Sequence, residues 1–192
     1  MNLTVTLDRC PRPWQPQPVQ RRPTLSLNEW AVLGLLVERP RHGYDIASEL
    51  RPGTPVGEVW RLSRQLVYRA LERLEALGLV EPRRTEHGTG PPRTVYGPTR
   101  RGRDALRRWL VTPVDHLRDV RSAFLLKLVL LERLGFERGD LVAAQRVAFA
   151  DLFARRAAAP TPDSVATLWR RHSAAAAASF LDGLENPPRR TR

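Results

Sequence analysis

The chain has 192 residues, a formal net charge of +12 and 42% hydrophobic residues, which suffices for one domain of ordinary size or two small ones. Its single cysteine, Cys10, cannot build a disulfide framework or a four-ligand zinc site. The most hydrophobic run, residues 123–131, is about nine residues long and contains Lys127, whereas a bilayer span needs roughly 20, so we expect a soluble protein without a membrane partner.

The first elements read as a tail followed by short helices. Residues 1–24 are rich in Pro, Gln and Arg and lack the apolar core of a signal peptide, so a disordered arm is expected. Apolar residues at helical spacing predict a helix over about 27–38, which Pro40 ends, and a shorter helix over about 43–51. Residues 54–62 are predicted to be an extended or irregular lead-in to the next helix.

The segment 63–78 is the most informative of the chain. Ser63 caps a helix that Gly78 ends. One side of this helix is apolar and consists of Leu66, Val67, Ala70, Leu71, Leu74 and Leu77. The other side of its first two turns carries hydrogen-bond donors: Arg64, Gln65, Tyr68 and Arg69. Such donors bind guanine edges, adenine edges and phosphates, so the helix is a candidate for the DNA major groove; a merely solvated polar face is the alternative.

The residues that follow this helix indicate a β-hairpin. Residues 79–85 and 93–96 alternate as strands do, and the segment between them is rich in Gly and Pro. A helix-turn-helix followed by a basic hairpin is the winged-helix arrangement, and its wing would hold three arginines beside the phosphate backbone: Arg83, Arg84 and Arg93. Charge agrees, since residues 61–108 contain 12 Arg against five acidic residues, a net charge of +7 that attracts a polyanion.

Short motifs in a fixed order give this region a family resemblance. They are Leu33-Gly34-Leu35-Leu36, His42-Gly43-Tyr44-Asp45-Ile46, Tyr68-x-x-Leu71-x-Arg73-Leu74-Glu75-x-x-Gly78-Leu79-Val80 and Pro92-Arg93-x-x-Tyr96-x-x-Thr99-x-x-Gly102. Residues 25–111 thereby resemble the DNA-binding domain of the PadR family of transcriptional regulators. The resemblance implies a winged helix, helices after it that join two subunits, and a response to small aromatic or hydrophobic compounds.

The C-terminal part is predicted to be helical, after a helix that begins near Thr99. Residues 120–134 are apolar nearly all round, which requires burial inside a bundle or between subunits. A helix is expected over about 139–158, and the last one starts at Thr161-Pro162. Its apolar stripe consists of Val165, Trp169, His172, Ala176 and Phe180. We interpret 114–186 as one separate three-helix domain for dimerisation and effector binding, with a basic tail at 187–192; core packing within one chain is the alternative.

Three residues are candidates for contact with a small aromatic or hydrophobic ligand: Trp109, Trp169 and His172. A Trp on a helix stripe is a core residue more often than a ligand contact, and this alternative stays open. Enzymatic motifs are missing, since the sequence has no HExxH, CxxC, GxSxG or GxGxxG pattern. We therefore expect no catalytic residue, no metal site and no cofactor.

The fold class expected is mainly α (α+β), a winged helix-turn-helix domain with a two-stranded wing plus a C-terminal helical dimerisation domain. The function expected is a dimeric, cytoplasmic, nucleoid-associated repressor that reads double-stranded DNA through Ser63, Arg64, Gln65, Tyr68 and Arg69. A non-specific architectural protein that binds DNA or RNA is the first alternative. A protein-interaction module that has lost DNA binding is the second.

Overall fold

The computed structural model describes residues 24–87, 92–158 and 164–185. In chain order its elements are α1 (Leu27–Glu38), β1 (Arg41–His42), α2 (Gly43–Glu49), α3 (Pro55–Val59), α4 (Arg64–Ala76), β2 (Val80–Glu86), β3 (Arg93–Pro98), α5 (Arg100–Val111), the 3₁₀ turn η1 (Leu117–Asp119), the π turn η2 (Val120–Phe124), α6 (Leu125–Arg133), α7 (Gly139–Ala157) and α8 (Val165–Glu185). The predicted arm over 1–24, apart from its last residue, and the basic tail at 187–192 lie outside these residues.

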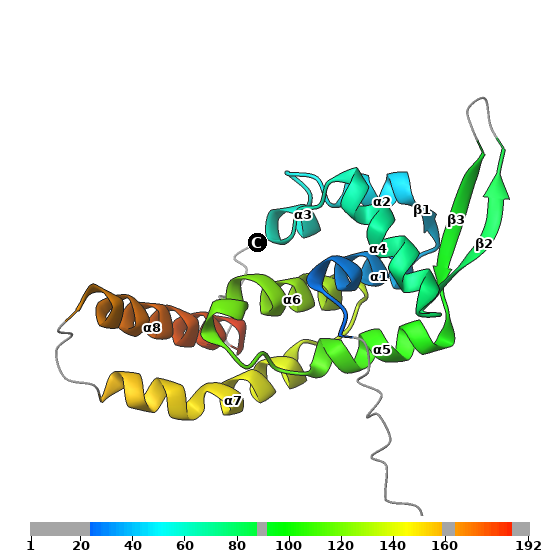
Figure 1. Ribbon diagram of the computed structural model, residues 1–192. Helices are drawn as coiled ribbons and strands as arrows, with labels where there is room; N and C mark the ends of the chain where they lie inside the picture. The colour runs from blue at the N-terminus through cyan, green and yellow to red at the C-terminus, as the bar shows by residue number, and fades with distance from the viewer. Residues whose placement is uncertain (1–23, 88–91, 159–163, 186–192) are drawn as a thin grey trace, which may run out of the picture.

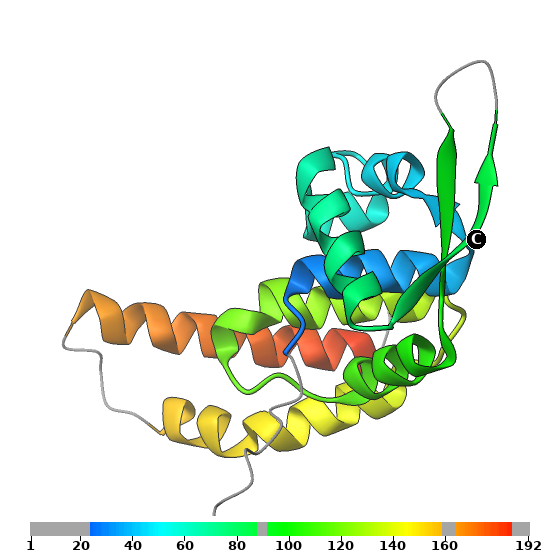
Figure 2. The ribbon, with the colours of Figure 1, turned by 45° about the vertical axis from the view of Figure 1, so that its right-hand side comes forward.

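The arrangement is that of a winged helix with further helices, as predicted. Helices α1 to α4 gather beside the hairpin formed by β2 and β3, and α5 and α6 lie beneath α1 (Figure 1). Helices α7 and α8 run side by side and project away from the hairpin, which the turned view also shows (Figure 2). None of the described helices is both long and apolar enough to cross a membrane.

Helix α4 forms where the sequence predicts it. The Ser63 hydroxyl accepts a hydrogen bond from the Leu66 amide, and Gly78 ends the helix with a φ of +65°, a conformation that favours glycine. Four of the predicted apolar residues are buried against α1 and α2: Val67, Ala70, Leu71 and Leu74. Leu66 differs, because it sits at the edge of the buried side and is 37% exposed.

The prediction of an extended or irregular stretch over residues 54–62 is wrong for its first half, which forms the short helix α3. The Thr54 hydroxyl accepts a hydrogen bond from the Gly57 amide, and Pro55 occupies the first turn, where its missing N–H costs nothing. Val56 is fully buried and fixes the turn to the core. The Thr-Pro pair was the signal for this helix, but a segment of one turn has too few residues to show helical periodicity.

The sheet has three strands in the order β1-β3-β2, one more than the predicted hairpin. Strand β1 pairs Arg41 with Tyr96 and His42 with Val95. Strands β2 and β3 pair from Val80 opposite Pro98 to Glu86 opposite Arg93, with an irregularity between Pro82 and Arg84. A two-residue strand leaves no alternating pattern in a sequence, so only the tertiary pairing reveals β1. The tip of the predicted wing loop falls in residues 88–91, which the structure does not describe.

Helix α6 packs on the winged helix itself and not only on the helices that follow it. Its Leu130 side chain lies so close to Gly34 of α1 that a Cβ at Gly34 would stand 2.6 Å from it. At its C-terminal end, Arg133 forms ion pairs with Glu38 of α1, at 2.8 Å, and with Glu49 of α2, at 2.9 Å. Residues of α6 belong to the same hydrophobic core as residues of α1 and α4. The division into domains at 25–111 and 114–186 stays a prediction.

Two buried polar side chains hold the segment between α5 and η1. The fully buried Gln145 of α7 accepts a hydrogen bond from the Val114 amide, at 2.7 Å, and donates one to the Val114 carbonyl, at 2.9 Å. Lys127 of α6, only 3% exposed, donates to the carbonyl of Thr112 at the end of α5. This connection is therefore a packed part of the fold and not a loose linker.

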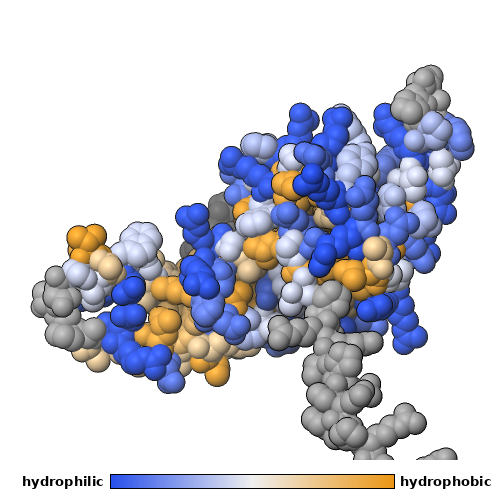
Figure 3. All heavy atoms as spheres, in the orientation of Figure 1, coloured by the Kyte–Doolittle hydropathy of each residue, from blue (hydrophilic) through white to orange (hydrophobic). Residues whose placement is uncertain are grey.

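The predicted stripe of the last helix faces outward for most of its length. Val165 is 85% exposed and Trp169 is 72% exposed, whereas the residues that face the rest of the chain are Ala174, Ala177 and Leu181. Orange, hydrophobic atoms accordingly mark the projecting end formed by α7 and α8 in Figure 3, while the surface over α2, α3 and the wing is mainly hydrophilic. The predicted start of this helix at Thr161-Pro162 falls outside the described residues.

Candidate nucleic-acid interface

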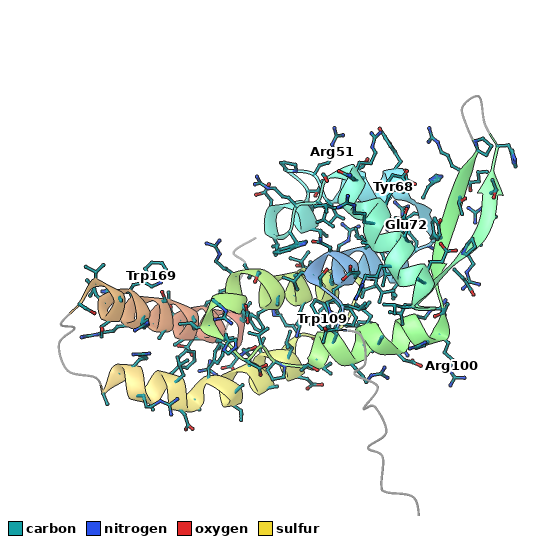
Figure 4. The ribbon with its side chains drawn as sticks, in the orientation of Figure 1. Arg51, Tyr68, Glu72, Arg100, Trp109 and Trp169 are labelled. Atoms are coloured by element: carbon teal, nitrogen blue, oxygen red, sulfur yellow. The ribbon has the colours of Figure 1, made fainter. Side chains whose placement is uncertain are left out.

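The polar side of α4 presents the side chains that the sequence singles out. Arg64, Gln65 and Arg69 are exposed, and Tyr68 is 44% exposed. Ser63 caps the helix, so its hydroxyl is engaged by the Leu66 amide. Tyr68, marked in Figure 4, packs its ring against Gly43 at the start of α2, where a Cβ would come within 2.7 Å of it. Glycine at this position thus lets the recognition helix sit close to α2.

The two arginines of β2 are paired with glutamates of the same strand. Arg83 lies 2.8 Å from Glu81 and donates a hydrogen bond to the carbonyl of Pro98. Arg84 lies 2.7 Å from Glu86 and stays largely exposed. Contact with a phosphate would require each guanidinium to exchange or share its carboxylate partner, and such exposed pairs cost little to break.

Arg93, the third predicted wing residue, is held differently. Its guanidinium carbon lies 5.7 Å from the centre of the Tyr44 ring in α2, and that of Arg64 lies 5.0 Å from the same centre. Tyr44 stood out in the sequence only as part of a family motif and not as a site residue. A tyrosine in the first turn of a short predicted helix was the signal available in the sequence.

His42 ties α2 to the wing. Its Nδ1 atom lies 2.9 Å from a carboxylate oxygen of Asp45, and its Nε2 atom lies 3.1 Å from a carboxylate oxygen of Glu86. Glu86 also forms an ion pair with Arg84. The His42 ring therefore links the start of α2 to strand β2, which carries Arg83 and Arg84. Two residues therefore connect α2 to the other elements of the candidate interface: His42 contacts β2, and Tyr44 contacts α4 and β3.

The three residues predicted to contact an effector are not gathered in one place. Trp109 of α5 stacks on Trp30 of α1, with ring centres 4.8 Å apart, and Lys127 lies 4.8 Å above the Trp109 ring. Trp169 lies far from Trp109, on the projecting helix α8 (Figure 4), and His172 of the same helix is exposed. Trp109 is thus a partly buried residue packed against the core, whereas Trp169 lines a groove.

That groove runs between η1–η2 and α8 and has a volume of about 980 Å³. Its apolar lining includes Leu117, Val120, Leu125, Trp169 and Phe180, and its charged lining consists of three arginines and one acid: Arg118, Arg121, Arg170 and Asp119. No cluster of three or more His, Cys, Asp or Glu side chains suited to a metal ion occurs among the described residues.

Comparison with known proteins identifies the domain. A model of the transcriptional regulator PadR-like family matches residues 32–108, the span from α1 to α5. This span, residues 32–108, is similar to the PadR-like family of transcriptional regulators. Members of this family are transcriptional regulators and not enzymes, which agrees with the sequence interpretation.

Relatives of this PadR-like chain include the negative transcriptional regulator PadR of Bacillus subtilis (strain 168), which is 30% identical over 99 residues. The match covers 52% of this chain and 53% of the relative, about half the length of each. Among solved structures, B. subtilis PadR in complex with operator DNA is similar with a TM-score of 0.46 and 22% identity, over 85% of this chain and 97% of that one. The same regulator in complex with p-coumaric acid is similar with a TM-score of 0.41 and 22% identity, over 84% and 96%.

Proposed function

We propose that this PadR-like regulator is a dimeric repressor that binds a specific pseudo-palindromic DNA duplex through α4 and the wing. The observation that carries the proposal is the convergence of Arg64 from α4 and Arg93 from the wing on Tyr44, which brings both elements to one basic side of the molecule. The relative in B. subtilis is a negative regulator, which favours repression. Ser63, Gln65, Tyr68 and Arg69 complete the proposed contact surface of the recognition helix.

We assign each side chain of this surface a role according to the element that carries it. Arg64, Gln65 and Tyr68 enter the major groove, with Arg69 near a phosphate, while Arg83, Arg84 and Arg93 hold the backbone. Loss of a bidentate base contact costs about 1–3 kcal/mol and relaxes specificity at one position. Loss of a phosphate contact weakens all sequences alike and lowers the salt dependence by roughly one unit of slope.

Fluorescence anisotropy tests this function on the duplex upstream of the chain's own gene, with a scrambled duplex of equal length and composition as competitor. At about 150 mM salt, a specific regulator prefers its site by roughly a thousandfold or more. Equal binding, repeated with fragments selected from the whole genome, would instead support a non-specific architectural protein. Identical specificity profiles for Arg64→Ala and Arg84→Ala would contradict the division of roles.

A second copy of the chain is the proposed partner of α8. The stripe with Val165 and Trp169 leaves large apolar side chains in water, where burial would stabilise an interface by about 25 cal/mol per Å². A two-fold dimer doubles the DNA contacts and fixes the spacing of two half-sites. Pairing through α8 therefore supports DNA binding by bringing two copies of α4 and the wing onto one duplex.

An aromatic effector is the proposed releasing signal, and the groove beside Trp169 is its proposed site. Apolar walls with arginines at hand suit an aromatic ring that carries a negative group. p-Coumaric acid, the ligand of the B. subtilis structure, is the first compound to titrate while DNA-bound anisotropy and tryptophan fluorescence are followed. Release that Trp169→Leu prevents would support the groove; release that this variant leaves unchanged would place the site elsewhere.

A further inference from the structure

The Tyr44 side chain stands where three elements of the proposed DNA surface meet. It belongs to the first turn of α2, Arg64 is the first residue of α4, and Arg93 is the first residue of β3. Both guanidiniums lie within the roughly 6 Å of a ring centre at which cation–π attraction operates. The Tyr44 ring thus contacts one cation from the recognition helix and one from the wing.

Arg64 and Arg93 differ from Arg83 and Arg84 in having N–H donors that no carboxylate occupies. Arg83 and Arg84 donate to carboxylates of Glu81 and Glu86. Among the described residues, by contrast, Arg64 and Arg93 have no carboxylate or hydrogen-bond acceptor as a partner, only the Tyr44 ring. An arginine stacked on a ring uses its flat face, so its N–H donors, which lie in the plane of the guanidinium, stay available to an anion.

Two cations on one ring also repel each other. No carboxylate of the described residues forms an ion pair with either guanidinium, so an anion that reaches both would relieve the repulsion and accept hydrogen bonds from both. Phosphates of a DNA backbone have this charge and these acceptor oxygens. Tyr44 itself is only half-buried, which leaves the cluster open to a ligand as large as a duplex.

We propose that Tyr44 is a positioning residue that stacks Arg64 and Arg93 side by side, so that one backbone phosphate bridges the recognition helix and the wing. This inference rests on the proposed DNA-binding function and adds to it a specific pairing of two elements. Arg64 then contacts this phosphate in addition to the base edge proposed for it, and Gln65 and Tyr68 supply the other base contacts. The wing and α4 bind as one unit and not as two independent contacts.

Substitutions at position 44 separate the ring from the hydroxyl. Tyr44→Phe keeps the ring and is expected to bind the operator within about twofold of the unmodified chain. Tyr44→Leu removes both cation–π contacts, each worth about 0.5–1 kcal/mol at exposed sites, and is expected to bind about five- to thirtyfold more weakly. Thermal unfolding of both variants checks that the fold is intact.

The shared phosphate gives a second, independent measurement. Operator duplexes with a single uncharged methylphosphonate at each position in turn locate the phosphate on which binding depends. Arg64→Ala and Arg93→Ala should both become insensitive to substitution of that same phosphate. In the chain that keeps Tyr44, the two substitutions together should cost less binding free energy than the sum of their separate costs. In the Tyr44→Leu variant the two costs should add. Arg155→Ala, on the projecting helix α7, controls for the loss of one positive charge.

Each outcome decides the inference. A Tyr44→Leu chain that binds as tightly as the unmodified one, or a Tyr44→Phe chain that loses as much as Tyr44→Leu, overturns it. Arginine losses that map to different phosphates overturn it as well, although specific binding by the unmodified chain would leave the proposed function standing. An unmodified chain that binds no duplex would remove both.

Discussion

Gly34 shows how a single missing side chain fixes the position of a helix. A Cβ at this residue would meet the Leu130 methyl groups at 2.6 and 2.7 Å, closer than packed atoms approach, so a side chain there would force Leu130 or α6 to shift. The contact is far from the DNA surface. A substitution at Gly34 should therefore change the free energy of unfolding and leave the DNA contacts unchanged.

We expect Gly34→Ala to lower the free energy of unfolding by about 1–3 kcal/mol, the usual cost of overpacking a close contact. Gly183 of α8 is the matched control, because a Cβ at that residue would have no atom within 4 Å and alanine favours a helix by about 0.5–1 kcal/mol. Urea unfolding of Gly34→Ala and Gly183→Ala measures the difference. Equal stability changes would show that α6 can move away from α1 without cost.

Between elements, the end of α5 and helix α6 are joined by a buried amine. Lys127 is the only lysine among 32 basic residues of the chain, and its ammonium group donates to the Thr112 carbonyl beside the Trp109 ring. Burial lowers the pKa of Lys127 to about 8 from the usual 10.5, and Asp115 opposes this shift in part. The unfolded chain thus holds this proton more strongly than the folded chain.

Stability should therefore rise with pH above the folded pKa of Lys127. Between about pH 7 and pH 9.5 the free energy of unfolding is expected to increase by about 2 kcal/mol from this group, because the unfolded chain binds more protons over that range. Urea unfolding at several pH values measures the slope. Lys127→Met, which has no titrating group, should lack this increase, and a slope that survives in this variant would assign it to another residue.

At the scale of elements, the sequence predicted what periodicity encodes and missed what only tertiary contacts create. Helix α4 has enough turns to show its apolar side, and Ser63 and Gly78 mark its ends chemically. Helix α3 and strand β1 are too short for a period. The pairing of Arg83 and Arg84 with glutamates, and of Arg93 with Tyr44, depends on strand register, which alternation alone does not fix.

The molecule as a whole has two surfaces of opposite character. The side with α2, α4 and the wing is basic and hydrophilic, while the far end of α8 exposes Val165, Leu168 and Trp169 to solvent. Sequence periodicity located this second stripe but could not say whether it faces a core or a partner. In the folded chain Val165, Leu168 and Trp169 face outward, so they are accessible to a second copy of the chain.

Trp169→Asp tests the connection between the two surfaces. A carboxylate at the centre of an apolar interface loses its hydration without gaining a partner, so we expect monomers where the unmodified chain forms dimers. Sedimentation velocity measures the state of assembly, and Val147→Asp, which places the same charge on a 77% exposed residue of α7, is the control. Because a monomer keeps only one half-site contact, operator affinity should fall by at least about tenfold, whereas affinity for a single half-site should stay unchanged. A Trp169→Asp chain that remains dimeric, or a monomeric one that binds the full operator undiminished, would mean that α8 does not bring two recognition helices onto one duplex.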